Sequence, residues 1–147
     1  PELPRIQARA VRVASITPVH LGLAVELEVH NPNSFPLMVR AANGKLAIGG
    51  DVEVGTGQAT LNADVPADAS SIVVADLTLN WTNIAALAPL AASASSVPYV
   101  FRGTAVLGGE RLNANIPFTV NGEISREQVI QLGMSGLFPA HGSPGLQ

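Results

Sequence analysis

Apolar and polar residues alternate with a period of two along most of this chain. The clearest case is residues 21–29, where Leu or Val occupies every odd position and Gly, Ala or Glu stands between them. Successive side chains of a strand point to opposite faces, so this pattern predicts a strand with one buried face and one wetter face. The sequence Asn31-Pro32-Asn33 then ends the strand, because proline has no backbone donor.

The same alternation predicts further strands elsewhere in the chain. Residues 38–42 and 45–48 flank Asn43-Gly44 and form either two short strands or one bulged strand. Gly49-Gly50 predicts a turn, and Gly108-Gly109 predicts a two-residue hairpin turn. The remaining predicted strands cover residues 5–17, 52–65, 70–81, 97–107 and 110–120.

One helix is expected after the strand at residues 70–81. Thr82 or Asn83 provides a cap, and the apolar residues of one helical face are Ile84, Leu87 and Ala91. Pro89 lies inside this segment, so the helix is either short or kinked.

A second, shorter helical segment is predicted near the C-terminus. Ser125 and Gln128 have the spacing of a capping box for a helix that continues to Leu132. We interpret residues 1–132 as a single domain and residues 133–147 as a flexible C-terminal tail.

The spacing of these elements indicates the fold class. About seven strands at intervals of roughly ten residues, with one short α-helix and no βαβ rhythm, are typical of an antiparallel β-sandwich. The predicted architecture is therefore mostly β, with two face-to-face sheets of the immunoglobulin or fibronectin type III kind.

The Asn-Pro-Asn segment is the most distinctive local feature. Asn31 precedes a proline and is pushed away from the helical region, Pro32 fixes its own φ, and the Asn33 amide can bond nearby backbone. These properties predict a rigid corner where the chain crosses from one sheet to the other, with Phe35 anchoring the corner to the core. An ordinary polar turn remains an alternative on these residues alone.

The stretch VELEVHNPNSFPLMVRAANGKLAIGGDVEVGTG resembles the water stress and hypersensitive response (WHy) domain of group 2 late embryogenesis abundant (LEA) proteins, in its bacterial form. The resemblance extends over about residues 5–124. It implies a seven-stranded sandwich with one helix, a role in tolerance of desiccation, cold or other stress, and no catalytic residue. The segments that carry it, besides residues 29–33, are residues 46–50, 72–79, 84–93 and 99–120.

Composition limits the classes of partner. A formal net charge of -3 with scattered basic residues argues against nucleic acid, which requires clustered positive charge. No cysteine is present, so disulfides and thiolate sites are excluded. No apolar run approaches the roughly 20 residues of a membrane helix.

Localisation is inferred indirectly. The chain begins at Pro1 without a leader, which suggests processing or trimming. An Ala-, Val- and Arg-rich composition looks bacterial, so the expected location is the bacterial cell envelope, in the periplasm, with membrane attachment through a lipid anchor before Pro1 as an option. The cytoplasm is the alternative, and we expect a monomer.

The histidines and carboxylates are the candidate catalytic or metal-binding groups. His20 and His30 flank one strand, which places them roughly 33 Å apart if it is straight, so they share no ligand. His141 falls in the predicted tail. Glu26 and Glu28 share one strand face.

A calcium site would need these two acids to meet a second acidic pair, Asp51 and Glu53, on a paired strand. No twelve-residue loop of oxygen ligands is present, and alternating acids usually form a solvated strand face. The sequence therefore predicts no metal site.

Other short motifs give no stronger prediction of an enzyme. GMSGL around Ser135 is not a nucleophile elbow, and GTGQAT at Gly55 lacks the third glycine of a nucleotide-binding loop. Asn80-Trp81-Thr82 fits a glycosylation sequon, which we interpret as coincidence, with Trp81 in the core. No catalytic residue and no cofactor are predicted.

Two functions are consistent with these patterns. The first is non-enzymatic stress protection, in which weak surface contacts shield labile client proteins from inactivation or aggregation. The alternative is a cell-envelope module that binds a lipid between its sheets or a protein partner at a sheet edge.

Overall fold

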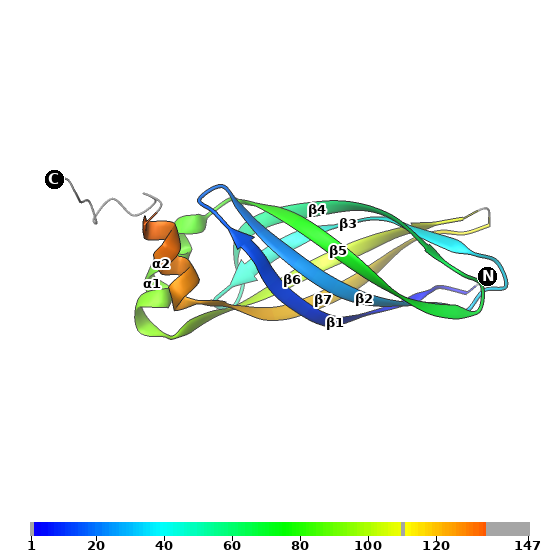
Figure 1. Cartoon of the computed structure of the whole chain (residues 1–147), viewed down its shortest axis with the longest axis horizontal. Helices are drawn as coiled ribbons and strands as arrows, with labels where there is room; N and C mark the ends of the chain where they lie inside the picture. Colours follow the sequence, from blue (N-terminus) through cyan, green and yellow to red (C-terminus); the bar gives the residue numbers. More distant parts are fainter. Residues whose placement is uncertain (1, 110, 135–147) are drawn as a thin grey trace.

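The computed structural model describes residues 2–109 and 111–134 of this mostly β protein. Seven antiparallel strands form one sheet in the order β1-β2-β5-β4-β3-β6-β7. The sheet curls until β1 and β7 lie close together, which makes a nearly closed, barrel-like structure (Figure 1). The strands are β1 (Arg5–Ile16), β2 (His20–Asn31), β3 (Leu37–Ile48), β4 (Val52–Val65), β5 (Ala69–Trp81), β6 (Ser96–Gly108) and β7 (Asn113–Ser125).

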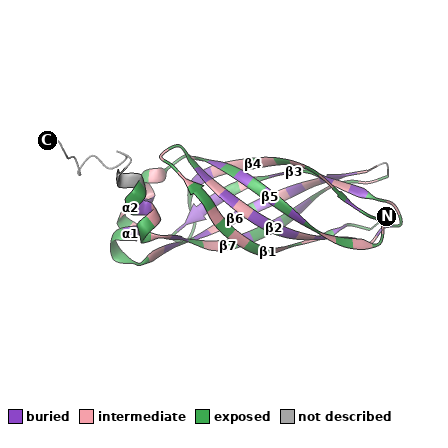
Figure 2. Ribbon diagram, viewed as in Figure 1, coloured by how far each residue is buried: buried purple, intermediate pink, exposed green. Residues whose placement is uncertain are grey.

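Strand β2 confirms the alternation seen in the sequence. Its five odd-numbered apolar residues are at most 1% exposed, whereas Glu26 between them is exposed. The strand is paired on both sides, with β1 and β5. Figure 2 shows the resulting bands of buried and exposed residues along the strands. The buried residues of β2 are Leu21, Leu23, Val25, Leu27 and Val29.

The predicted separation into two face-to-face sheets is not confirmed, because all seven strands belong to one sheet. Strands β1, β2 and β5 form one half, and β4, β3, β6 and β7 form the other. The halves are joined because residues 55–58 of β4 pair with residues 78–81 of β5, and this short ladder makes them one sheet. The immunoglobulin or fibronectin type III type is not confirmed. Alternation identifies the buried face of each strand, but it does not specify which strands share hydrogen bonds.

Strand β3 resolves the alternatives left open around Asn43-Gly44. Residues 37–48 form one strand, with a register shift against both neighbours between Val39 and Ala41. Gly44 lies within the strand and faces Gly103 of β6, with no turn at this point. The predicted turn at Gly49-Gly50 is confirmed, with φ values of 53° and 95°.

The predicted two-residue turn at Gly108-Gly109 is wrong. The last pair of the β6–β7 ladder is Gly108 with Asn113, so Gly108 belongs to β6 and the loop is longer. The Gly109 N–H donates to the Leu112 carbonyl at 2.9 Å. The Arg40 side chain of β3 lies where a Cβ of residue 108 would stand.

The first helical segment lies at one end of the sheet (Figure 1). It consists of a 3-10 turn (Ile84–Ala86) and α1 (Leu87–Ser93), so the helix is short, as predicted. Pro89 falls in the first turn, where an N–H has no partner within the helix. The predicted side-chain cap is wrong, because Asn83 precedes the 3-10 turn and makes no capping hydrogen bond.

The capping box predicted for the second helix is confirmed. The Ser125 N–H donates to Gln128 Oε1 at 2.9 Å, and the Gln128 N–H donates to Ser125 Oγ at 3.1 Å. Helix α2 (Arg126–Met134) thus extends two residues into the predicted tail. The rest of that tail, residues 135–147, lies outside the described residues. No helix in the described part of the chain has both the length and the apolar character needed to span a membrane.

The close packing of β3 against β6 generates a stability prediction. A Cβ added at Gly44 would lie 2.7 Å from the Cα of Gly103, which is backbone and cannot rotate away. We expect Gly44→Ala to lower the free energy of unfolding by about 1–3 kcal/mol, measured by urea denaturation. Thr119→Ala, at an exposed site on β7, should change it by less than about 0.5 kcal/mol. Equal midpoints and slopes for Gly44→Ala and the wild type would contradict this packing.

Candidate functional site: the Asn-Pro-Asn corner

The Asn-Pro-Asn corner lies at the end of the sheet opposite the helices (Figure 1). Asn31 is the last residue of β2, where its backbone pairs with Ala69 of β5. The chain then passes to β3, in the other half of the sheet. Backbone groups released from the ladder at such a crossing need local partners.

The side-chain amide of Asn31 supplies several of these partners. The side chain is fully buried, and its Nδ2 group donates to the carbonyls of Phe35 at 2.8 Å and Pro66 at 3.2 Å, with Val65 O at 3.5 Å. Val65 and Pro66 lie at the end of β4, where β4 and β5 share no ladder. The Asn31 amide therefore connects β2 to β4 across the opening between the two halves of the sheet.

Asn33 connects the corner to two other segments. Its Nδ2 donates to the Glu2 carbonyl at 2.8 Å, and the Glu2 N–H donates to Asn33 Oδ1 at 2.7 Å, a pairing that resembles one rung of a β-ladder. The Asn33 carbonyl accepts from the Asp68 N–H at 2.9 Å. Both the N-terminal segment and the β4–β5 turn are thus held to the corner.

The two asparagines also bond each other. The Asn31 Oδ1 atom accepts from the Asn33 N–H at 3.0 Å and from its Nδ2 at 3.2 Å. Pro32 between them is half-buried. Because each amide bonds other groups of the chain, the geometry suits a structural connection better than capture of a ligand.

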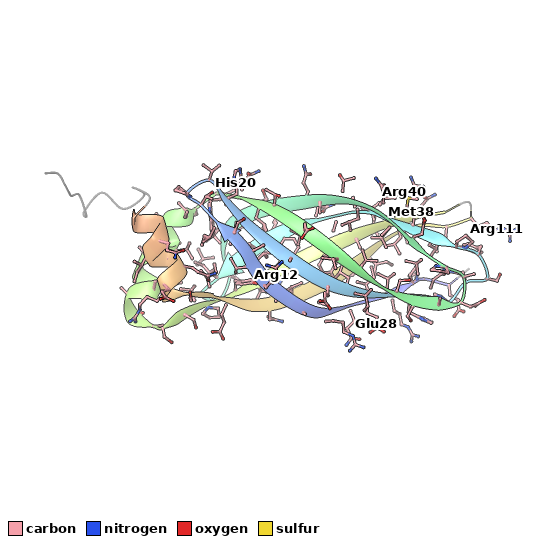
Figure 3. All side chains as sticks on the ribbon, viewed as in Figure 1. Arg12, His20, Glu28, Met38, Arg40 and Arg111 are labelled. Atoms are coloured by element: carbon pink, nitrogen blue, oxygen red, sulfur yellow. The ribbon has the colours of Figure 1, made fainter. Side chains whose placement is uncertain are left out.

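Phe35 packs against the core from a half-buried position, as predicted. The Arg111 guanidinium lies 5.8 Å from the centre of its ring, within the range of a cation–π contact. Figure 3 shows Arg111 at the same end of the molecule as the corner.

His20 and His30 lie far apart on β2, as predicted. His20 and His30 pair with Asn80 and Ser70, near opposite ends of β5. His30 Nδ1 lies 2.9 Å from Ser70 Oγ. Figure 3 shows His20 toward the helical end of the sheet.

The acidic pairs also stay apart, because β2 and β4 are not neighbours in the sheet. Three of the four acids face basic groups instead: Arg9 lies 2.6 Å from Glu28, Arg102 lies 3.2 Å from Asp51, and Lys45 lies 3.8 Å from Glu53. Across residues 2–109 and 111–134, no three His, Asp or Glu side chains lie close enough together to hold a metal ion.

The GTGQAT motif lies within β4 and has a packing role. An added Cβ at Gly57 would lie 2.6 Å from Leu79 Cγ and 2.9 Å from the Thr78 carbonyl, so this residue must be small where β4 and β5 pair. Trp81 is half-buried against the core, and its indole N–H donates to the Thr17 carbonyl at 2.9 Å. Ser135 and His141 lie outside the described residues.

Sequence reasoning did not single out Tyr99, the only tyrosine of the chain. It is 2% exposed and pairs with Gly122 of β7, where an added Cβ would overlap the hydroxyl group. Burial raises the pKa of Tyr99 from 10.0 to about 12, because the interior disfavours the phenolate. Its inward position in the alternation of residues 97–107 was the available signal.

Replacing each corner asparagine by alanine should distinguish a loss of stability of the whole domain from a local release of the N-terminal segment. Asn31→Ala removes a buried donor from the carbonyls of Phe35, Val65 and Pro66 and should lower the free energy of unfolding by about 2–3 kcal/mol. Asn33→Ala should cost about 1 kcal/mol and mainly release the N-terminal segment, seen as faster hydrogen exchange at the Glu2 amide. If Asn31→Ala is no less stable than Asn33→Ala, the assignment of the main connection to Asn31 is wrong.

Tyr99 should make stability fall at high pH. The unfolded chain ionises near pH 10 and the folded chain near pH 12, so the free energy of unfolding should decrease as pH rises through this window. Tyr99→Phe should lack this part of the decrease. The phenolate absorbance of the native protein provides the direct measurement, and a midpoint near pH 10 would contradict the burial of the hydroxyl.

Comparison with known proteins gives the fold and the family. A protein of Arabidopsis thaliana, AT1g01470, has a TM-score of 0.64 and 15% identity, and the alignment covers 82% of this chain and 80% of that chain. A protein from Archaeoglobus fulgidus has a TM-score of 0.58 and 15% identity, with coverage of 81% and 97%. The LEA protein At2g46140.1 has a TM-score of 0.51 and 15% identity, with coverage of 84% and 71%.

A search of curated proteins finds no significant match. The model of the family described as "Late embryogenesis abundant protein" (LEA_2) matches residues 26–122, about two thirds of the chain. This range contains the whole Asn-Pro-Asn corner and strands β3 to β6. The chain therefore belongs to the LEA_2 family of late embryogenesis abundant proteins.

Proposed function

We propose that this chain is a non-enzymatic stress-protection protein that shields labile proteins from inactivation or aggregation during drying, freezing or heating. Membership of the LEA_2 family is the observation that carries the proposal. The finer assignment to the bacterial WHy group and to the cell envelope is part of the same proposal. It is supported by the Asn-Pro-Asn segment and by the composition.

The outer surface suits weak contacts with many clients. Neutral hydrogen-bonding groups occupy exposed positions, such as Asn115, Thr119 and Asn121 on β7 and Gln58 and Thr60 on β4. Charged residues make up only 13% of the chain. Hydrogen bonding by neutral groups depends little on salt, which becomes concentrated when water freezes or evaporates.

The interior supports surface contact over binding of a lipid between the strands. Large side chains from both halves of the sheet occupy it and are at most 1% exposed, so the space is filled by the chain itself. We therefore place the client contacts on the outside. The largest of these side chains include Phe101, Leu23, Leu46, Leu77 and Leu107.

The test is protection of a labile dehydrogenase during freezing and thawing. The enzyme is frozen with this protein or with an equal mass of albumin, and the activity that survives is measured. We expect clearly more activity with this protein than with albumin. Equal protection by albumin would show that the effect comes from bulk protein, and the proposed function would then be wrong.

A further inference from the structure

Part of strand β5 has an open edge. β5 pairs with β2 along residues 69–80, but on its other side it pairs with β4 only through residues 78–81. In the described part of the chain, residues 69–77 therefore have a ladder partner on one side only. At about 3.3 Å per residue this edge is about 30 Å long, enough for an added strand of several residues.

The other free edges carry features that discourage pairing. Beside this opening, β4 has a bulge near Asn62, whose φ is 50°. Strand β1 has two register shifts, next to Ala10 and Ser15, and exposes three arginines. Strand β7 contains Pro117, which has no N–H to donate. Bulges, proline and charge are common means by which proteins protect a strand edge, and residues 69–77 contain no bulge or proline.

Apolar side chains stand on the outer face of this same segment. Ile72 is 57% exposed and Val74 is 52% exposed, although both lie in a regular strand. Their neighbours on β2 are Glu28 and Glu26. An edge with exposed β-branched residues offers both a backbone ladder and a strip of apolar surface to an extended chain.

The charges around the strip indicate what would bind there. Glu28 has Arg9 as a partner, but no ion pair occurs for Glu26 or Asp76 among residues 2–109 and 111–134. Both carboxylates lie on the exposed face beside Val74. A segment with Lys or Arg next to its apolar residues would complement them, whereas a second copy of this chain would bring the same acids together.

We propose that the open edge of β5, residues 69–77, binds an extended segment of a partly unfolded client protein by adding it to the sheet as a strand. The client segment has alternating apolar residues and flanking Lys or Arg. Its backbone completes the ladder of β5, and its apolar side chains cover Ile72 and Val74. This inference rests on the proposed protective function and adds to it a defined contact surface.

The direct test uses synthetic peptides with the full chain. One ten-residue peptide alternates Val and Thr between flanking lysines, a second has glutamates in place of the lysines, and a third has the lysines with prolines at alternate positions. Affinity is measured by calorimetry, and hydrogen exchange is followed at the amides of residues 69–77. We expect binding and slower exchange with the first peptide and much weaker binding of the other two. Equal binding of all three would overturn the proposal.

A positive charge placed beside Ile72 on the exposed face of β5 should weaken binding of the first, lysine-flanked peptide. Val74→Lys introduces repulsion and removes apolar surface, so we expect affinity to fall about tenfold. Val19→Lys is the matched control, because Val19 is 61% exposed in the β1–β2 turn and the substitution adds the same charge. It should bind as the wild type does. Equal loss in both variants, or in neither, would contradict a site on β5.

The acids should set the preference for the flanking charge. Glu26→Gln combined with Asp76→Asn should lower the affinity for the lysine-flanked peptide. The difference in affinity between this peptide and the glutamate-flanked one should become smaller. An unchanged preference would contradict the charge argument. Sedimentation of the chain alone tests whether a second copy occupies the β5 edge instead. A wild-type dimer that Val74→Lys dissociates would assign the edge to that second copy and overturn the proposal.

The dehydrogenase assay separates this inference from the function on which it rests. If Val74→Lys protects the enzyme as well as the wild type does, the function stands and the edge is not the contact. If the first peptide binds at β5 but the wild type protects no better than albumin, the edge site stands and the proposed function is wrong. Loss of protection in Val74→Lys but not in Val19→Lys supports both.

Discussion

The structure depends on one buried side-chain amide, that of Asn31. The two halves of the sheet share a ladder of only four residue pairs, far from the β4–β5 turn. At the turn itself, the Asn31 amide donates to the carbonyls of Phe35 and Pro66, and Asn33 binds the backbone of Glu2 and Asp68. The Asn31 amide is fully buried and its hydrogen bonds join three segments, so it stabilises the end of the sheet that has no helix to cover it.

The opening that Asn31 spans also gives β5 its open edge. The curled sheet leaves β4 and β5 unpaired over most of their length, and the chain protects β4 with a bulge but leaves Ile72 and Val74 of β5 exposed. A fully closed barrel would have no such edge. A fold that is nearly closed can therefore keep a filled, stable interior and still present a strand to a client, which is the combination that the proposed function requires.

Many of the strands and one helix start could be predicted from local sequence patterns. Alternation identified the strands and their buried faces, as in residues 21–29, and the Ser125–Gln128 spacing identified a helix start, because both depend on residues close together in the chain. The β4–β5 ladder and the approach of the Arg40 side chain to Gly108 depend on contacts between residues far apart in the chain, which no local pattern encodes. For the corner, the residues were recognised, but their partners Glu2, Val65, Pro66 and Asp68 come from segments that only the fold brings together.

Hydrogen exchange of the Asn31 side-chain amide tests the central claim most directly. The two Nδ2 hydrogens can be followed by nuclear magnetic resonance beside those of Asn115, which is exposed on β7. If Asn31 joins the halves of the sheet, its hydrogens exchange only when the whole domain unfolds, and they show contacts to Phe35 and Val65. Exchange as fast as that of Asn115, with the fold intact, would contradict the account.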